Sequence, residues 1–178
     1  MPLYLITLCH PYLLTTSQRR SLAQSITRIH STLFSAPSLF VNVRFMNADA
    51  ASSSEATAFV GGKESPTNSI AAHVRHGPSR PRSKYDELCA QIHSAWDEIV
   101  VDVQGKAASE EHKLHTIFVM GDIVAAWEQG FNIPEAGGDA AWIKENMREF
   151  ERRAGQGDGA MRDLVEEVRA RGGEWGIE

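Results

Sequence analysis

The hydrophobic pattern begins with residues 3–8 (LYLITL), an apolar run of strand length directly after Met1 and Pro2. Proline is common at the first residue of a strand, because it need not donate a hydrogen bond to a neighbouring strand there. Removal of Met1 would instead leave the nitrogen of Pro2 as a free secondary amine, held in place by the strand that follows. The pattern alone leaves both interpretations of Pro2 open.

Residues 17–34 show the spacing of an amphipathic helix. Its apolar positions recur every three or four residues: Leu22, Ile26, Ile29 and Leu33. Pro37 follows the end of this pattern, and residues 39–45 are predicted to form a strand. A strand, a helix and a second strand in this order give parallel pairing, so residues 2–46 are predicted to form a βαβ unit.

The same order of elements recurs further along the chain. A strand at residues 69–73, a helix at 83–103 and a strand at 114–120 are predicted to form a second βαβ unit over residues 68–120, preceded by a short hairpin or turn at residues 59–62 (FVGG). Two such units can lie in one four-stranded, mostly parallel sheet with two helices on one face, which is an α/β (α+β) fold. We expect the uncovered face to pack against other subunits in a closed ring, since parallel strands are usually buried on both faces.

The last third of the chain has a less regular pattern. Residues 122–129 are predicted to form a short helix or turn, residues 142–153 a helix, and the segment that ends at Gly172 a last amphipathic helix. We therefore divide the chain into a main domain at residues 1–148 and a C-terminal helical extension at residues 149–178.

Composition and charge exclude several classes of protein. The 178 residues fit one domain, and the formal net charge of -5 gives no broad basic surface, so no nucleic-acid partner is expected. No segment approaches the roughly 20 apolar residues of a membrane span, and the chain does not open like a signal peptide, so no membrane partner is expected. Cys9 and Cys89 have no metal or redox spacing. These features together predict a cytoplasmic protein.

Three arginines lie between the second unit's first strand and its helix: Arg75, Arg80 and Arg82. The carboxyl end of a parallel strand is where α/β folds place anionic ligands, and guanidinium groups suit a carboxylate. Arginines in a loop are often merely solvated. Gly77, Pro78 and Pro81 restrict this loop, which favours a shaped site.

His30 and Glu128 are further candidates, and each has a structural alternative. His30 lies at the edge of the apolar stripe, where most histidines are structural, although its side chain can donate or accept a proton near neutral pH. Glu128 follows Trp127, and an indole that partly desolvated this carboxylate would suit it to act as a base on water. A surface glutamate is the commoner outcome.

The histidine spacing does not predict a metal site. His73 and His76, like His112 and His115, are three residues apart, which on a strand places them on opposite faces. The sequence also lacks the glycine-rich phosphate loop of nucleotide-binding proteins and the serine of a nucleophile elbow. We therefore expect no metal site.

Together, the proline after Met1, the doubled βαβ unit, His30, the arginine pair and Glu128 resemble the tautomerase superfamily, and more closely its cis-3-chloroacrylic acid dehalogenase-like branch. The similarity covers about the first 146 residues and is strongest at residues 23–30, 59–62, 75–80 and 127–142. The resemblance implies a homotrimer without a cofactor.

The resemblance also implies roles for individual residues. Pro2 corresponds to the proton-transferring amine, His30 to the histidine that orients substrate and water, and Glu128 to the glutamate that activates water. Arg75 and Arg80 correspond to the pair that holds the substrate carboxylate if residues 78–79 are an insertion. Without that insertion Gly77 replaces the first arginine, and Arg75 or Arg82 would substitute for it.

The resemblance has one departure, since Val119 or Met120 stands where the family has a tyrosine. The expected substrate is a small unsaturated or 2-oxo carboxylic acid. Burial and nearby arginines would make Pro2 a base for keto-enol tautomerisation, whereas Glu128 would make it an acid for hydration or dehalogenation, so both reactions stay open. The alternative from another class is a non-catalytic trimeric interaction module of the same fold.

Overall fold

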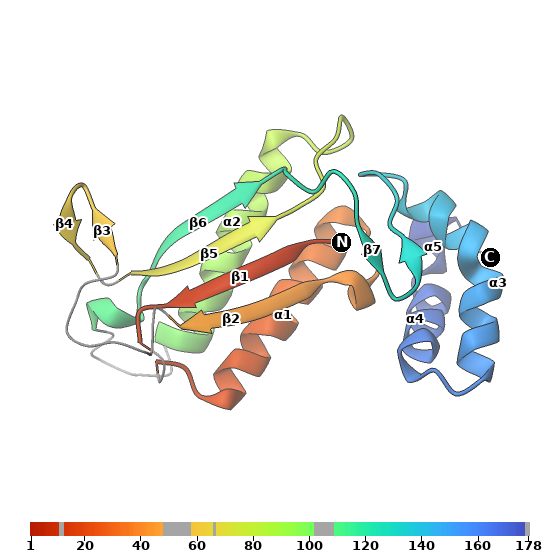
Figure 1. Cartoon of the computed structure of the whole chain (residues 1–178), viewed down its shortest axis with the longest axis horizontal. Helices are drawn as coiled ribbons and strands as arrows, with labels where there is room; N and C mark the ends of the chain where they lie inside the picture. Colours follow the sequence, from red (N-terminus) through yellow and green to blue (C-terminus); the bar gives the residue numbers. More distant parts are fainter. Residues whose placement is uncertain (11–12, 48–57, 66, 102–108, 177–178) are drawn as a thin grey trace.

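The computed structural model describes residues 1–10, 13–47, 58–65, 67–101 and 109–176. Its centre is a four-stranded sheet with the strand order β2-β1-β5-β6 (Figure 1). The strands are β1 (Leu3–Leu8), β2 (Asn42–Asn47), β5 (Asn68–His73) and β6 (Leu114–Met120). β1 pairs with β2 and β5 with β6 in parallel, whereas the central β1 and β5 are antiparallel. The predicted doubled unit and mostly parallel sheet are confirmed.

Two helices, α1 (Thr16–Phe34) and α2 (Arg82–Trp96), cover one face of the sheet, and Figure 1 shows both behind the strands. α1 begins with a capping box, in which Thr15 accepts from the backbone N–H of Gln18 and the Gln18 side chain accepts from that of Thr15. The core between helices and sheet contains alternate residues of the strands and the apolar stripes of both helices. These include Tyr4, Ile6, Ile70, Leu22, Ile26, Leu88, Ile92 and Trp96.

Two predicted elements have different limits in the structure. The chain after Pro37 first forms a 3-10 turn, η1 (Ser38–Phe40), so β2 begins only at Asn42. This happens because Phe40 is buried in a second core instead of the sheet. α2 gives way to a π-helical turn, η2 (Asp97–Val101), and residues 102–103 of the predicted helix lie outside the described residues.

Two short hairpins flank the sheet. β3 (Phe59–Val60) and β4 (Lys63–Glu64) form the predicted hairpin at residues 59–62, with both glycines of its turn at positive φ. The prediction of a helix or turn at residues 122–129 is wrong, because β7 (Trp127–Glu128) instead pairs with β8 (Phe131–Asn132). Gln129 and Gly130, with φ of 54° and 93°, form the turn between them.

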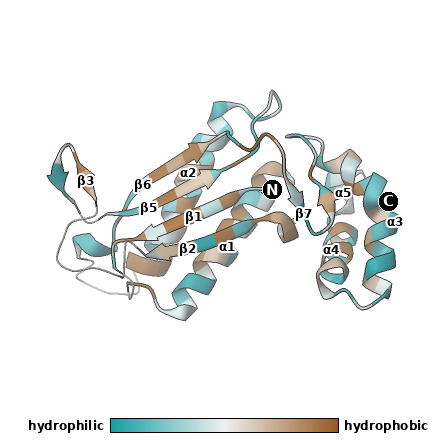
Figure 2. Ribbon diagram, viewed as in Figure 1, coloured by the Kyte–Doolittle hydropathy of each residue, from teal (hydrophilic) through white to brown (hydrophobic). Residues whose placement is uncertain are grey.

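The chain ends in three helices, α3 (Asp139–Gly155), α4 (Gly159–Ala170) and α5 (Gly172–Trp175). They build the second core, which includes Phe40, Phe131, Trp142, Phe150, Met161, Leu164 and Trp175. Figure 2 shows that hydrophilic residues predominate along α3. The guanidinium of Arg171 and the indole of Trp175 donate to the carbonyls of Ser31 and Ser35, so the extension caps the end of α1.

α3 runs across residue 148, where we divided the sequence, so the main domain and the extension share a helix. A short 3-10 turn, η4 (Glu110–His112), precedes β6. In the described part of the chain, no helix combines the length and the apolar character needed to cross a membrane.

Candidate active site

The first two residues lie at one end of the sheet, beside the loop that carries the arginines. The register aligns Leu3 with Asn42 of β2 on one side and with His73 of β5 on the other. Because β5 is antiparallel to β1, the start of the chain meets the carboxyl end of β5. Pro2 is buried, and its carbonyl accepts a hydrogen bond of 3.1 Å from the backbone N–H of Asn42. The two neighbouring strands therefore fix the position of residue 2.

The amino group of the chain lies where its charged form is disfavoured. The structure carries Met1, whose half-buried side chain packs against the second core. Burial, helped by the positive charges of Arg75 and Arg80, lowers the pKa of the Met1 amine to about 5, although Asp139 and Glu128 act in the opposite direction. An α-amine ordinarily titrates near pH 8. The Met1 amine is therefore largely neutral at pH 7.

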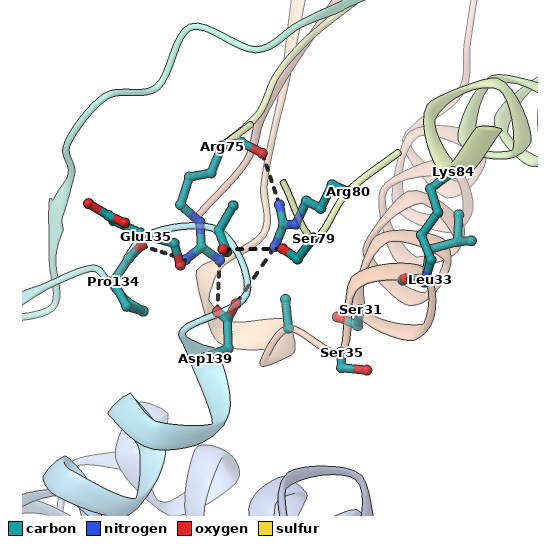
Figure 3. A network of polar contacts seen from close by, with 12 residues as sticks. Ser31, Leu33, Ser35, Arg75, Ser79, Arg80, Lys84, Pro134, Glu135 and Asp139 are labelled. Atoms are coloured by element: carbon teal, nitrogen blue, oxygen red, sulfur yellow. Dashed lines mark hydrogen bonds and ion pairs between the residues drawn. The ribbon is translucent and has the colours of Figure 1, made fainter. Parts of the chain in front are cut away.

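The guanidinium groups of Arg75 and Arg80 lie together and share a buried carboxylate, that of Asp139 (Figure 3). Nη2 of Arg75 donates to Oδ1 of Asp139 at 2.7 Å, and Nη2 of Arg80 lies 3.6 Å from Oδ2. Arg80 also donates to the carbonyl of Arg75 and stacks over the ring of Phe34, 4.6 Å from its centroid. All three charged residues are at most 6% exposed. Burial, together with the charge of Arg75, lowers the pKa of Arg80.

Two turns bring these charges together. The N–H of Arg80 donates to the carbonyl of Gly77, and the N–H of Gly138 donates to that of Glu135. Gly137 has a φ of 90°, and a Cβ at this position would lie 2.6 Å from Oγ of Ser79, so only glycine fits the second turn. This turn places Asp139 at the first residue of α3, where the helix dipole stabilises a carboxylate.

His30 lies in the last turns of α1 and is 1% exposed. Its Nδ1 forms a 2.8 Å hydrogen bond with the hydroxyl of Tyr4, while its Nε2 is buried without a partner. Burial lowers the pKa of His30 well below its usual value, and the charges of Arg80, the amino terminus and Arg75 add to this effect. Burial likewise raises the pKa of Tyr4. His30 is therefore neutral, and it lies close enough to Arg80, Arg75 and the amino terminus for their charges to affect its pKa.

Glu128 lies on β7 and faces the start of β2. Its Oε1 accepts a hydrogen bond of 2.9 Å from the side-chain amide of Asn42, and its Oε2 is buried without a partner. Asn42 thus links the carbonyl of Pro2 to the carboxylate of Glu128. Trp127 does not provide the shielding considered for Glu128, because Trp127 is 70% exposed and neighbouring strand residues point to opposite faces.

Arg82 does not join this cluster. Its side chain is 92% exposed and lies 3.7 Å from the carboxylate of Asp86, one turn along α2. At the position of the family tyrosine, Val119 is partly buried against the main core, and Met120 follows it on β6. Within the described ranges, no three His, Cys, Asp or Glu side chains are grouped so that they could hold a metal ion.

The cluster contains an unusual number of unsatisfied polar atoms. Six buried side-chain atoms in the described residues have no hydrogen-bond partner: Nε2 of His30, Oγ of Ser31, Nε of Arg75, Nη2 of Arg80, Oε2 of Glu128 and Oδ2 of Asp139. Five of them belong to the residues described above. Because buried polar groups in native proteins are nearly always paired, such a concentration is what a binding site for a polar ligand would show.

Cavities border this cluster on several sides. Arg75 lines one of about 370 Å³ together with Pro134 and Glu135. Arg80 and Asp139 line another of about 250 Å³, between the end of α1 and α5. Met1 lines a third of about 510 Å³, which also contains His73 and Trp127.

Three members of the cluster were not predicted: Tyr4, Asn42 and Asp139. Tyr4 belongs to the apolar alternation of β1, and nothing in its spacing marks the hydroxyl. Asn42 and Asp139 lie 86 and 64 residues from their partners Glu128 and Arg75, so no local pattern connects them. The one available signal for Asp139 is an acidic residue after two glycines at the start of a helix.

Comparison with known proteins assigns the chain to a family. Residues 1–147 match the family model described as putative oxalocrotonate tautomerase enzyme. The chain therefore belongs to this family, and the expected membership of the tautomerase superfamily is confirmed. No curated protein sequence matches the chain.

Solved structures share the fold. A member of the cis-3-chloroacrylic acid dehalogenase (cis-CaaD) family is 22% identical with a TM-score of 0.60, and the match covers 83% of this chain and 96% of that one. A probable enzyme from the thermophilic fungus Aspergillus fumigatus is also 22% identical, with a TM-score of 0.56 and coverages of 82% and 94%. Native RhCC from Rhodococcus jostii RHA1 is 16% identical, with a TM-score of 0.50 and coverages of 81% and 96%. At these identities the likeness concerns the fold.

Proposed function

We propose that the protein is an enzyme that uses the amine of Pro2, freed by removal of Met1, as a general acid or base on a small unsaturated or 2-oxo carboxylic acid. The observation that carries this proposal is the set of buried, unpartnered polar atoms around residue 2. His30, Arg80 and Glu128 each contribute one such atom. A polar substrate would satisfy these atoms together.

The substrate carboxylate would bind at the arginine pair. Nη2 of Arg80 is a buried donor without a hydrogen-bond partner, and Nε2 of neutral His30 can donate a second hydrogen bond if Nδ1 accepts from Tyr4. A guanidinium beside a carboxylate gives the stronger, charge-assisted bond. Arg75 supports the pair by its charge and its contacts to Asp139.

Tautomerisation is the first candidate reaction, because it needs a neutral amine at the start of the chain. A neutral Pro2 would remove the proton from the enol oxygen at C2 and deliver it to C3, so that the carbonyl forms at C2 and the amine is regenerated. The lowered pKa of the Met1 amine, one residue away, supports that role. Hydration or dehalogenation of a 3-substituted acrylate is the second candidate, because Glu128, held by Asn42, has one free carboxylate oxygen that could take a proton from water.

We also propose a homotrimer. By strand alternation, Leu5, Met46 and Phe118 belong to the sheet face opposite the helices, and Met46 and Phe118 are 48% and 60% exposed. Val124 and Trp127, which line a cavity together with Met1 and His73, are 96% and 70% exposed. An apolar surface of this kind is typical of a subunit interface. The unpaired Cys9 and Cys89 support the expected cytoplasmic location.

A non-catalytic trimeric module is the alternative, and two observations favour it. Met1 packs against the second core, and Asp139 already neutralises part of the arginine pair's charge. If Met1 stays in place, the nitrogen of Pro2 is an amide and cannot accept a proton.

Comparing two forms of the chain tests the proposal. One form begins at Pro2 and the other retains Met1, each verified by intact mass, and both are assayed for ketonisation of phenylenolpyruvate. The form that begins at Pro2 should turn over at least about 100-fold faster, the contribution of a positioned acid or base. Pro2→Ala should lose activity and keep the same oligomer by analytical ultracentrifugation. Equal turnover of the two forms would show that the amine is not the catalytic group.

A further inference from the structure

The arginine pair is closed on one side by a carboxylate of the protein itself. Oδ1 of Asp139 accepts from Arg75 at 2.7 Å, and Oδ2 lies 3.6 Å from Nη2 of Arg80. Figure 3 shows the carboxyl group of Asp139 pointing toward both guanidinium groups. Asp139 thus already occupies one side of the cluster to which a substrate carboxylate would bind.

Arg75 is largely committed to this arrangement. Its Nη1 donates to the carbonyls of Pro134 and Glu135 at 2.6 and 3.1 Å, and its Nη2 donates to Asp139. These three bonds hold the loop before α3 against the end of β5. Arg75 therefore holds Asp139 in place. Nη2 of Arg80 has no hydrogen-bond partner, although it lies within ion-pair distance of Asp139, so Arg80 is the arginine that can donate a hydrogen bond to a ligand.

The charges of the cluster set a limit on the ligand. Two guanidinium groups and one carboxylate leave one positive charge in a region where all three residues are at most 6% exposed. One ligand carboxylate balances that charge. A second ligand carboxylate would be buried without a counter-ion, and uncompensated buried charge is strongly unfavourable.

The space beside Arg80 and Asp139 on the side of α5 is also small. The cavity lined by Arg80 and Asp139 measures about 250 Å³, below the range of about 300–1,000 Å³ typical of sites for drug-sized molecules. The cavity is also lined by Ser79, Lys84 and Glu174. The positive charge of Lys84 and the negative charge of Glu174 cancel, so they do not change the net charge around the cavity.

We propose that Asp139 is a specificity-determining residue, an internal counter-ion that restricts the arginine pair to small monocarboxylates and excludes dicarboxylates. This inference rests on the proposed function and specifies in addition that the substrate carries a single negative charge. No proton transfer or other chemical step by Asp139 is involved.

Succinate and succinamate test the inference, because they have nearly the same shape and differ by one negative charge. Their affinities are measured by calorimetry at about pH 8, where both carboxyl groups of succinate are ionised. The wild-type chain should bind succinamate at least about tenfold more tightly than succinate, which corresponds to about 1.4 kcal/mol. Asp139→Asn keeps an oxygen that can accept from Arg75 and should improve succinate binding by at least about tenfold.

Glu135→Gln is the matched control. It removes the same charge from the same loop, but the exposed Glu135 side chain points away from the guanidinium groups in Figure 3, so the preference should not change. Equal binding of both ligands to the wild-type chain, or an unchanged preference in Asp139→Asn, would overturn the inference and leave the proposed function standing. If neither chain bound either acid, the carboxylate site of the proposed function would fall, and the inference with it.

Discussion

The hydroxyl of Tyr4 lies 2.8 Å from Nδ1 of His30, and both side chains are buried. Tyr4 belongs to β1 and His30 to the last turns of α1. The bond therefore connects the strand that follows Pro2 to the helix that carries the histidine. With Tyr4 as the donor, the proton of the neutral imidazole is on Nε2, the unpartnered atom.

Tyr4→Phe should therefore weaken both stability and activity. Leaving Nδ1 of His30 buried without a partner costs about 1–3 kcal/mol of unfolding free energy. We expect kcat/KM to fall by about tenfold or more, because the imidazole can then adopt the tautomer that does not donate from Nε2. NMR of ¹⁵N-labelled histidine reads the tautomer directly. Tyr85→Phe is the control, since its hydroxyl makes only longer bonds of 3.3 and 3.4 Å. An unchanged tautomer in Tyr4→Phe would contradict this role.

The stability of the fold should rise with pH in the range where His30 titrates in the unfolded chain. Burial lowers its pKa well below the usual value of about 6.5. Below that pH the unfolded chain binds a proton that the folded chain does not, so the free energy of unfolding falls as the pH falls. His30→Gln removes the group and should flatten the dependence between about pH 5 and 6.5 in urea unfolding. Parallel curves for the two chains would show that His30 is not buried as a neutral group.

The effects of replacing Arg80 and Arg82 should differ sharply, although only Pro81 separates the two residues. Arg80→Met keeps the apolar contact to Phe34 but removes the free donor, so KM for a carboxylate substrate should rise by at least about tenfold, with the loss of one charge-assisted hydrogen bond. Arg82→Met changes an exposed side chain and should leave KM within about twofold. Steady-state kinetics of both variants check this prediction. A similar rise in KM for both would contradict the assignment.

Glu128→Gln should separate the two candidate reactions. The variant keeps an acceptor for the Asn42 amide but cannot take a proton from water. Addition of water to a 3-substituted acrylate should fall by at least about 100-fold, whereas ketonisation of phenylenolpyruvate should stay within a few-fold. Glu64→Gln, in the distant β4, is the control for both assays. Equal losses of both activities in Glu128→Gln would assign the carboxylate a role other than water activation.

The sequence predicted the parts of the fold that depend on local periodicity. Leu22, Ile26, Ile29 and Leu33 are all buried on α1, because a stripe at helical spacing has one way to face a sheet. The order of strands and helices then restricted the sheet to few topologies. Residues 122–129 were misread because a two-residue strand such as β7 exists only through its pairing with β8.

The site was predictable where residues lie on the ends of these elements. His30, Arg75 and Arg80 lie together because α1 and β5 end near one another. Asp139 could not be predicted, since its position depends on the turn before α3 and on contacts across 64 residues of chain. The second core had no counterpart in the prediction either, because its residues come from η1, the β8 strand and the C-terminal helices.

Titration of the Pro2 amine tests the central claim most directly. The protein is prepared with ¹⁵N-labelled proline, its mass is checked for loss of Met1, and the chemical shift of the terminal nitrogen is followed with pH. Burial and the nearby guanidinium groups predict a pKa below the ordinary value of about 8, in the direction of the value of about 5 for the Met1 amine. A pKa at or above 8, or a mass that retains Met1, would contradict the account.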